Sequence, residues 1–291
     1  MCAFVWAALW LVVTGAAPHL AVAERPGLTP FEPGWKEDVV LAVRLNGRGP
    51  FRFLLDTGST HTAVSPATAA QIAAPAVARA SMGSAAGSRD TLVVRVDALE
   101  VGPVEVTGLL ASVVELDELI QGRGIDGVIG HDALASLRYT IDFRQRRVVW
   151  WPGQENVAQG SSFVLQPSHG RFVVSLPQRL SLLRLVPDTG AESLLLFDPD
   201  HTLPVTGLPA PATLKTPSGS TAVRLGLLRE LRVGSLTLRD VPAAVAERDE
   251  SEPSDIDGLL PLHVFDRVTI DGPRQRMIVG QIRADARLMF F

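Results

Sequence analysis

Two aspartates of this 291-residue chain stand where apolar runs end. Asp56 follows Phe53-Leu54-Leu55 and begins the segment Asp-Thr-Gly-Ser, and Asp188 begins Asp-Thr-Gly-Ala after a second apolar run. An ionised carboxylate is costly to bury unless it is paired or hydrogen-bonded, so an aspartate at the end of a buried strand needs a structural or functional explanation. One such aspartate is explained by turn chemistry, since Asp-x-Gly is common in turns. Two in matching contexts predict a pair that meets in the folded protein.

Two carboxyl groups within hydrogen-bonding distance can split an amide bond. They cannot both ionise cheaply, so one keeps its proton while the other stays charged. The charged group can take a proton from water, and the protonated group can donate one to a carbonyl oxygen. The neighbours suit this chemistry, because glycine lets two backbones approach closely and a threonine hydroxyl can satisfy backbone groups at a crowded junction.

The sequence around the two aspartates repeats. Asp56 and Asp188 are 132 positions apart, and three further pairs of segments recur in the same order at offsets of 132, 131 and 129: Leu99–Gly102 with Leu231–Gly234, Ile125–Ile129 with Ile256–Leu260, and Thr140–Asp142 with Thr269–Asp271. A nearly constant offset indicates duplication of a unit of about 130 residues, the size of a domain.

Local patterns favour strands. Asn46-Gly47 between two apolar runs is a hairpin signal, and we expect strands at 93–101, 104–114, 148–151 and 223–233. Short helices are expected at 66–74 and 131–137, and a polar stretch at 152–162 is the expected linker. The predicted fold is therefore mainly β, with two homologous β-rich lobes at residues 36–150 and 163–291.

The segments "FLLDTGST" with "GIDGVIG", and "LVPDTGAE" with "DIDGLLP", resemble the aspartic peptidases of the retropepsin and pepsin-like group. The likeness covers about residues 36 to 291 and is to two retropepsin-like lobes in one chain. It implies a bilobed acid-protease fold with a catalytic cleft between the lobes. It also implies an aspartic-type endopeptidase, a hydrolase of peptide or protein substrates, that uses Asp56 and Asp188.

The resemblance extends to residues around this pair. It assigns the supporting active-site loops to Thr57, Gly58, Ser59, Thr189, Gly190 and Ala191. Family members cover the substrate with a β-hairpin flap, and the flap candidates here are Gly83, Gly87 and Gly219. The flap tyrosine of pepsin-like members is absent, because the only tyrosine is Tyr139.

Other interpretations use the same residues. Asp126 and Asp257 repeat inside the Ile-Asp-Gly segments, where we expect a structural role. Residues 122–127 spell G-x-G-x-x-G, but no βαβ pattern surrounds them. A non-catalytic peptide-binding or protein-binding module on the same fold is the alternative function. An enzyme that needs two chains is a third reading, although two complete motifs favour a monomer.

Composition limits the remaining classes. Hydrophobic residues make up 46% and charged residues 20%, as in globular proteins, and the net charge of −4 gives no basic face for nucleic acid. The single Cys2 leaves no disulfide, and the histidines lack metal-ligand spacing, so no cofactor or metal is expected.

The N-terminus has the pattern of an export signal. An apolar run and Ala21-Val22-Ala23 predict a signal peptide at residues 1–23 and an exported protein, periplasmic or secreted. No Lys or Arg precedes the run, so an uncleaved N-terminal membrane anchor is the alternative.

Overall fold

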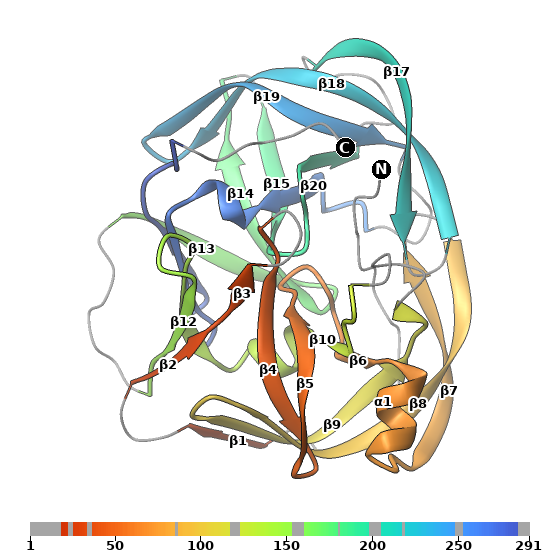
Figure 1. Cartoon of the computed structure of the whole chain (residues 1–291). Coiled ribbons are helices and arrows are strands. Elements are labelled where there is room, and N and C mark those ends of the chain that lie inside the picture. The colour runs from red at the N-terminus through yellow and green to blue at the C-terminus, as the bar shows by residue number, and fades with distance from the viewer. Residues whose placement is uncertain are drawn as a thin grey trace.

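The computed structural model describes residues 19–22, 26–33, 37–84, 87–116, 123–152, 160–179, 181–197, 205–216, 219–247 and 253–284. The chain folds into two β-rich lobes, one above the other in Figure 1. The described elements of the first half are β1 His19–Val22, β2 Gly27–Pro30, β3 Glu32–Pro33, β4 Val39–Leu45, β5 Arg48–Leu55, β6 Ala63–Val64, α1 Pro66–Gln71, β7 Ala76–Ser84, β8 Gly87–Val101, β9 Val104–Val113, β10 Gly127–Ile129, α3 His131–Leu134, β11 Arg138–Asp142 and β12 Arg147–Trp150.

The second half repeats this order. Its described elements are β13 Ser161–Ser168, β14 Arg171–Pro177, β15 Leu182–Asp188, β16 Leu194–Phe197, β17 Val205–Thr216, β18 Gly219–Val233, β19 Leu236–Ala246, β20 Gly258–Pro261, η2 Leu262–Val264, β21 Arg267–Asp271 and β22 Arg276–Val279. Strands pair as β9-β6-β10-β5-β4 in one lobe and as β19-β16-β20-β15-β14 in the other. The same order of neighbours in both lobes confirms the duplication predicted from the sequence.

A sheet shared by the two halves joins the lobes. It runs β13-β22-β21-β11-β12-β2, so each half contributes three strands. The central pair is antiparallel, with Thr140 opposite Thr269 and their hydroxyl oxygens 2.8 Å apart. These threonines belong to the two copies of the Thr-Ile-Asp repeat. The two copies therefore pair with each other where the lobes join.

Local residue choice explains the turns. The hairpin between β4 and β5 is closed by Asn46 and Gly47, both at positive φ, as a tight hairpin of this kind requires. The repeated turn glycines Gly102 and Gly234 also have positive φ, at 56° and 61°. The same left-handed turn therefore closes β8–β9 and β18–β19.

The helices are shorter than the sequence pattern predicted. Ser65 caps α1 by accepting a hydrogen bond from the Thr68 N–H, and Pro66 occupies the first turn. The helix ends at Gln71 instead of residue 74, because Ala73 takes a left-handed φ of 52° and Pro75 follows. Helix α3 ends at Leu134, three residues before the predicted limit.

The N-terminal prediction falls mostly outside the described residues, which begin at His19. Residues 19–22 form β1, antiparallel to β9. No helix in the described part of the chain is long and apolar enough to cross a membrane. The signal peptide and the anchor both stay predictions, as do the lobe limits. Strand β2 lies before the expected start of the first lobe.

Candidate active site

Asp56 and Asp188 stand at equivalent ends of equivalent strands. β5 runs parallel to β10, with Leu55 opposite Ile129, and the Asp56 N–H donates to the Ile129 carbonyl at 3.0 Å. In the second lobe, β15 runs parallel to β20, with Asp188 opposite Pro261. The Ile-Asp-Gly segments thus lie directly beside the strands that deliver the two aspartates.

The aspartates of the Ile-Asp-Gly segments hold these strands. Asp126 Oδ2 accepts the Arg52 backbone N–H at 2.8 Å, and Asp257 Oδ2 accepts the Arg184 backbone N–H at 2.9 Å. The Arg184 guanidinium also donates to Asp257. Both carboxylates are therefore bound to a neighbouring strand, which agrees with the structural role expected for them.

The two Asp-Thr-Gly loops interlock through their threonines. Thr57 Oγ1 donates to the Pro187 carbonyl at 2.7 Å and accepts the Thr189 N–H at 3.1 Å. Thr189 Oγ1 donates to the Leu55 carbonyl at 2.6 Å and accepts the Thr57 N–H at 3.1 Å. The four buried hydrogen bonds repeat one pattern in both directions, so each loop is held in place by the other lobe.

Each carboxylate is also held by its own loop. Asp56 Oδ1 accepts the N–H groups of Gly58 and Ser59 at 2.9 and 3.1 Å. Asp188 Oδ1 accepts those of Gly190 and Ala191 at 2.7 and 3.1 Å. Ser59 Oγ additionally donates to the His61 carbonyl, whereas Ala191 has no hydroxyl to do so. The Oδ1 atom of each carboxyl is thus held by its own loop, and the Oδ2 atom faces the loop of the other lobe.

The glycines explain how closely the carboxyls approach. A Cβ placed on Gly58 would lie 2.4 Å from Cγ of Asp188, and one on Gly190 would lie 2.8 Å from Oδ2 of Asp56. Each carboxyl therefore rests against the glycine of the opposite loop, in space that any side chain would occupy. The structure brings together all the predicted residues of the two loops.

The pair is buried and electrostatically coupled. Each aspartate is 1% exposed. Burial, followed by the charge of Asp188, raises the pKa of Asp56 well above its ordinary value. Burial also raises the pKa of Asp188, to about 6, although the N–H of Gly190, the adjacent Asp56 carboxyl and the charge of Arg171 oppose the rise. Two such carboxyls share a proton, with one neutral and one charged.

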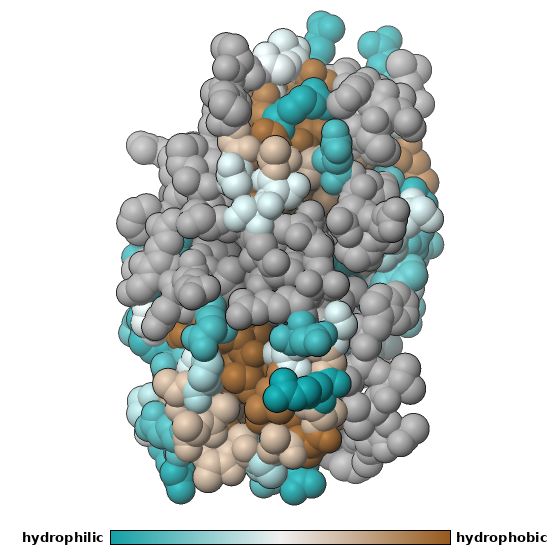
Figure 2. Space-filling model, turned by 90° about the vertical axis from the view of Figure 1, so that its right-hand side faces the viewer, coloured by the Kyte–Doolittle hydropathy of each residue, from teal (hydrophilic) through white to brown (hydrophobic). Residues whose placement is uncertain are grey.

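The flap candidates lie at the tips of two hairpins. Gly83 and Gly87 are beside the turn of β7–β8, where Ser84 pairs with Gly87, and Gly219 pairs with Thr216 at the tip of β17–β18. The hairpins come from different lobes and extend toward each other along one side of the molecule (Figure 1). Brown hydrophobic side chains gather in the upper and lower parts of that face (Figure 2).

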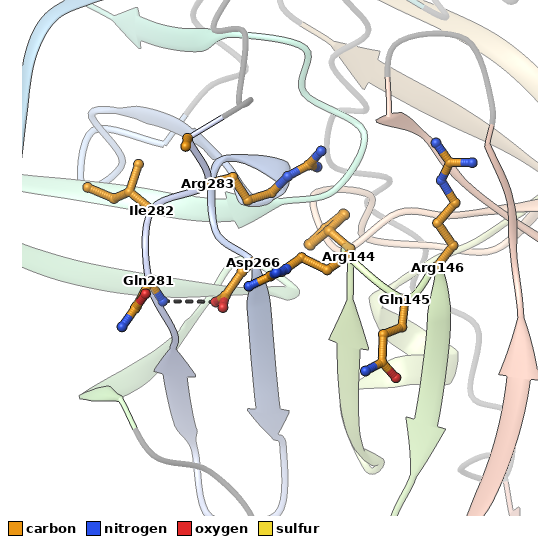
Figure 3. A pocket seen from close by; sticks show the side chains of 9 residues that line it. Arg144, Gln145, Arg146, Asp266, Gln281, Ile282 and Arg283 are labelled. Carbon is orange, nitrogen blue, oxygen red and sulfur yellow. Dashed lines mark hydrogen bonds between the residues drawn. The ribbon is translucent and has the colours of Figure 1, made fainter.

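A pocket of about 590 Å³ is separate from this pair. Its lining comes from the turn at 143–146, Asp266 and the segment 281–284 (Figure 3). Asp266 accepts the Gln281 backbone N–H at 2.8 Å. Neither Asp56 nor Asp188 is among the residues that line this pocket.

Sequence reasoning missed four charged residues next to the two loops. Arg123 Nη1 donates to Asp38 Oδ2 at 2.5 Å, and its Nη2 lies 3.6 Å from Glu192 Oε1. Burial raises the pKa of Asp38 to about 7, and the charge of Arg123 opposes the rise. Arg171, the fourth, is 1% exposed. Their positions in the sequence were the available signal: Asp38 directly precedes β4, Arg171 begins the matching strand β14, and Glu192 is four residues after Asp188.

The class of protein follows from this arrangement and from its relatives. The described residues include no group of three or more His, Cys, Asp or Glu side chains that could hold a metal ion. The family model for aspartyl proteases matches residues 41–133 and 181–264, which together exceed half of the chain. The chain belongs to the aspartyl protease family, and its bilobed, mainly β fold is that of a protease of this kind. No curated protein matches the sequence.

Proposed function

We propose that this protein is an aspartic endopeptidase of the retropepsin and pepsin-like group, with Asp56 and Asp188 as its catalytic pair. The observation that carries the proposal is the mutual contact of each carboxyl with the glycine of the other loop. That contact places one carboxyl from each lobe at a single point. Membership of the aspartyl protease family supports the reaction class, which is peptide-bond hydrolysis.

The chemistry follows from the shared proton. The ionised carboxylate takes a proton from a water molecule, whose oxygen attacks the peptide carbonyl carbon. The neutral carboxyl donates its proton to the carbonyl oxygen, giving a tetrahedral diol. The diol collapses when a proton passes to the amide nitrogen and the C–N bond breaks. The interlocked threonines hold both carboxyls at fixed geometry throughout, as such proton transfers require.

The two hairpins are the proposed flaps. Their tips lie on one side of the molecule, and each comes from a different lobe. We propose that the substrate is an extended peptide held beneath them, with apolar side chains toward the lobes. A monomeric state is part of the same proposal, because one chain carries both motifs. An exported location is also proposed, on the basis of the N-terminal signal pattern.

The test is peptide-library cleavage by the purified full-length chain from about pH 3 to pH 8. Asp56→Asn and Asp188→Asn should each abolish turnover while leaving the fold intact by circular dichroism. Asp97→Asn is the matched control, because Asp97 is exposed on β8 and forms an ion pair with Arg95. Turnover retained by either variant of the pair would refute the assignment. No cleavage by the unaltered protein at any pH would favour the peptide-binding module.

A further inference from the structure

The strand next to each aspartate carries a charged residue at the matching place. β4 pairs antiparallel with β5, with Val40 opposite Leu54, and two further residues along this register Asp38 falls opposite Asp56. β14 pairs antiparallel with β15, with Val174 opposite Leu185. The paired stretch ends there, but the same register continued by three residues points Arg171 toward Asp188, and the charge of Arg171 acts on that carboxyl. One lobe therefore places a carboxyl beside its aspartate, and the other places a guanidinium.

Both neighbours are buried, so water screens them little. Arg171 is 1% exposed and Asp38 is 7% exposed. The hairpin that carries Arg171 packs on the first lobe, since Gly170 faces the Thr60 side chain and Phe172 meets the His131 ring edge-on at 4.4 Å. Arg171 is thus held at the junction of the lobes, where the two aspartates meet.

The other charged groups around the two aspartates reinforce this difference between the lobes. Near Asp188, Arg171 is positive, and His131 is neutral because burial lowers its pKa to about 4. The nearby His61 lies 3.7 Å from Asp132, which offsets its charge when it is protonated. Near Asp56, the carboxyls of Asp38 and Glu192 share the guanidinium of Arg123, and Asp38 becomes negative as the pH rises through its pKa of about 7. The Asp188 side therefore favours a negative charge, and the Asp56 side disfavours one.

We propose that Arg171 and Asp38 are positioning residues that give the two catalytic carboxyls different roles. Arg171 holds Asp188 as the ionised base, and Asp38 keeps the shared proton on Asp56. This inference rests on the proposed function. Asp188 then takes the proton of the attacking water, and Asp56 gives its own to the carbonyl oxygen. On collapse of the diol, Asp188 passes its proton to the leaving nitrogen and Asp56 recovers one from the diol hydroxyl, which restores the starting state.

The direct test needs no substrate. In Asp56→Asn only Asp188 of the pair remains, beside Arg171, and in Asp188→Asn only Asp56 remains, beside Asp38. The pKa of each surviving carboxyl is measured by NMR titration of protein labelled with ¹³C at the aspartate carboxyls. We expect Asp188 to titrate at least about one pH unit below Asp56. Equal values, or the reverse order, would overturn the assignment even if the protein is a peptidase.

The causal test removes one charge at a time. Arg171→Met should move the acid limb of the kcat/KM profile up by about one pH unit, a tenfold loss on that limb, and Arg171→Lys should restore it. Arg138→Met is the control, because Arg138 is largely buried on β11 and pairs with Asp271. If Arg171→Met does not fold, Asp38→Asn decides, since it should move the alkaline limb down. An unmoved limb in a folded variant would refute the role of that residue, whereas absent cleavage in the unaltered protein would refute only the proposed function.

Discussion

The interlock of the two threonines gives the most direct prediction for stability. Thr57→Val keeps the shape of the side chain but removes its hydroxyl. The change leaves the Pro187 carbonyl without its 2.7 Å donor and the Thr189 N–H without its 3.1 Å acceptor. Both groups are buried at the junction of the lobes, where water does not replace the lost partner.

The magnitude follows from these two groups. A buried polar group left without a partner costs about 1–3 kcal/mol, so two of them predict a loss of about 2–6 kcal/mol in the free energy of unfolding. Thr189→Val should cost a similar amount, because it removes the mirror-image pair of hydrogen bonds to Leu55 and Thr57. The double variant should cost less than both losses added together, since either change already loosens the same junction.

The assay is urea unfolding at one pH, followed by circular dichroism. Thr237→Val is the matched control, because Thr237 is exposed on β19, and it should change the free energy by less than about 0.5 kcal/mol. A loss below about 1 kcal/mol for Thr57→Val, or a loss equal to that of the control, would refute the reasoning. It would mean that the interlock does not hold the lobes together.

Three further predictions concern the carboxyl pair. Because the pKa of Asp188 is raised to about 6, kcat/KM measured from pH 3 to pH 9 should fall as the pH drops below about 6; full activity at pH 4 would contradict this. Both aspartates have raised pKa values in the folded state, so their protonation stabilises the fold at low pH, and this stability is lost as the pH rises through these values. Asp56→Asn should therefore raise the free energy of unfolding more at pH 8 than at pH 4. A uniform effect in urea titrations at the two pH values would argue against coupled burial. Gly58→Ala should lower kcat at least about 100-fold by displacing the Asp188 carboxyl, while Thr237→Ala, at an exposed site on β19, should not; equal rates for the two variants would refute the importance of the contact between Gly58 and the Asp188 carboxyl.

The pattern of the chain was sufficient for the loops and for the repeat. Asp-Thr-Gly after an apolar run sets its own local geometry, because the aspartate accepts the N–H groups of the two residues that begin the next turn. The structural role of Asp126 and Asp257 was also predictable, since each recurs in a short segment next to its strand. Helix ends were less predictable, because the left-handed φ of Ala73 is not marked by its residue type.

The sequence by itself thus determined two β-rich repeats, each ending a buried strand in Asp-Thr-Gly, because these features depend on neighbours within a few residues. Only the tertiary structure decided which charges face the two aspartates. Asp38 and Arg171 are each more than fifteen residues from the aspartate that they face, and strand register brings them there. Glu192 and Arg123 meet only because the lobes pack together. Charge acts through space, so a difference between the two carboxyls cannot be read from two nearly identical motifs.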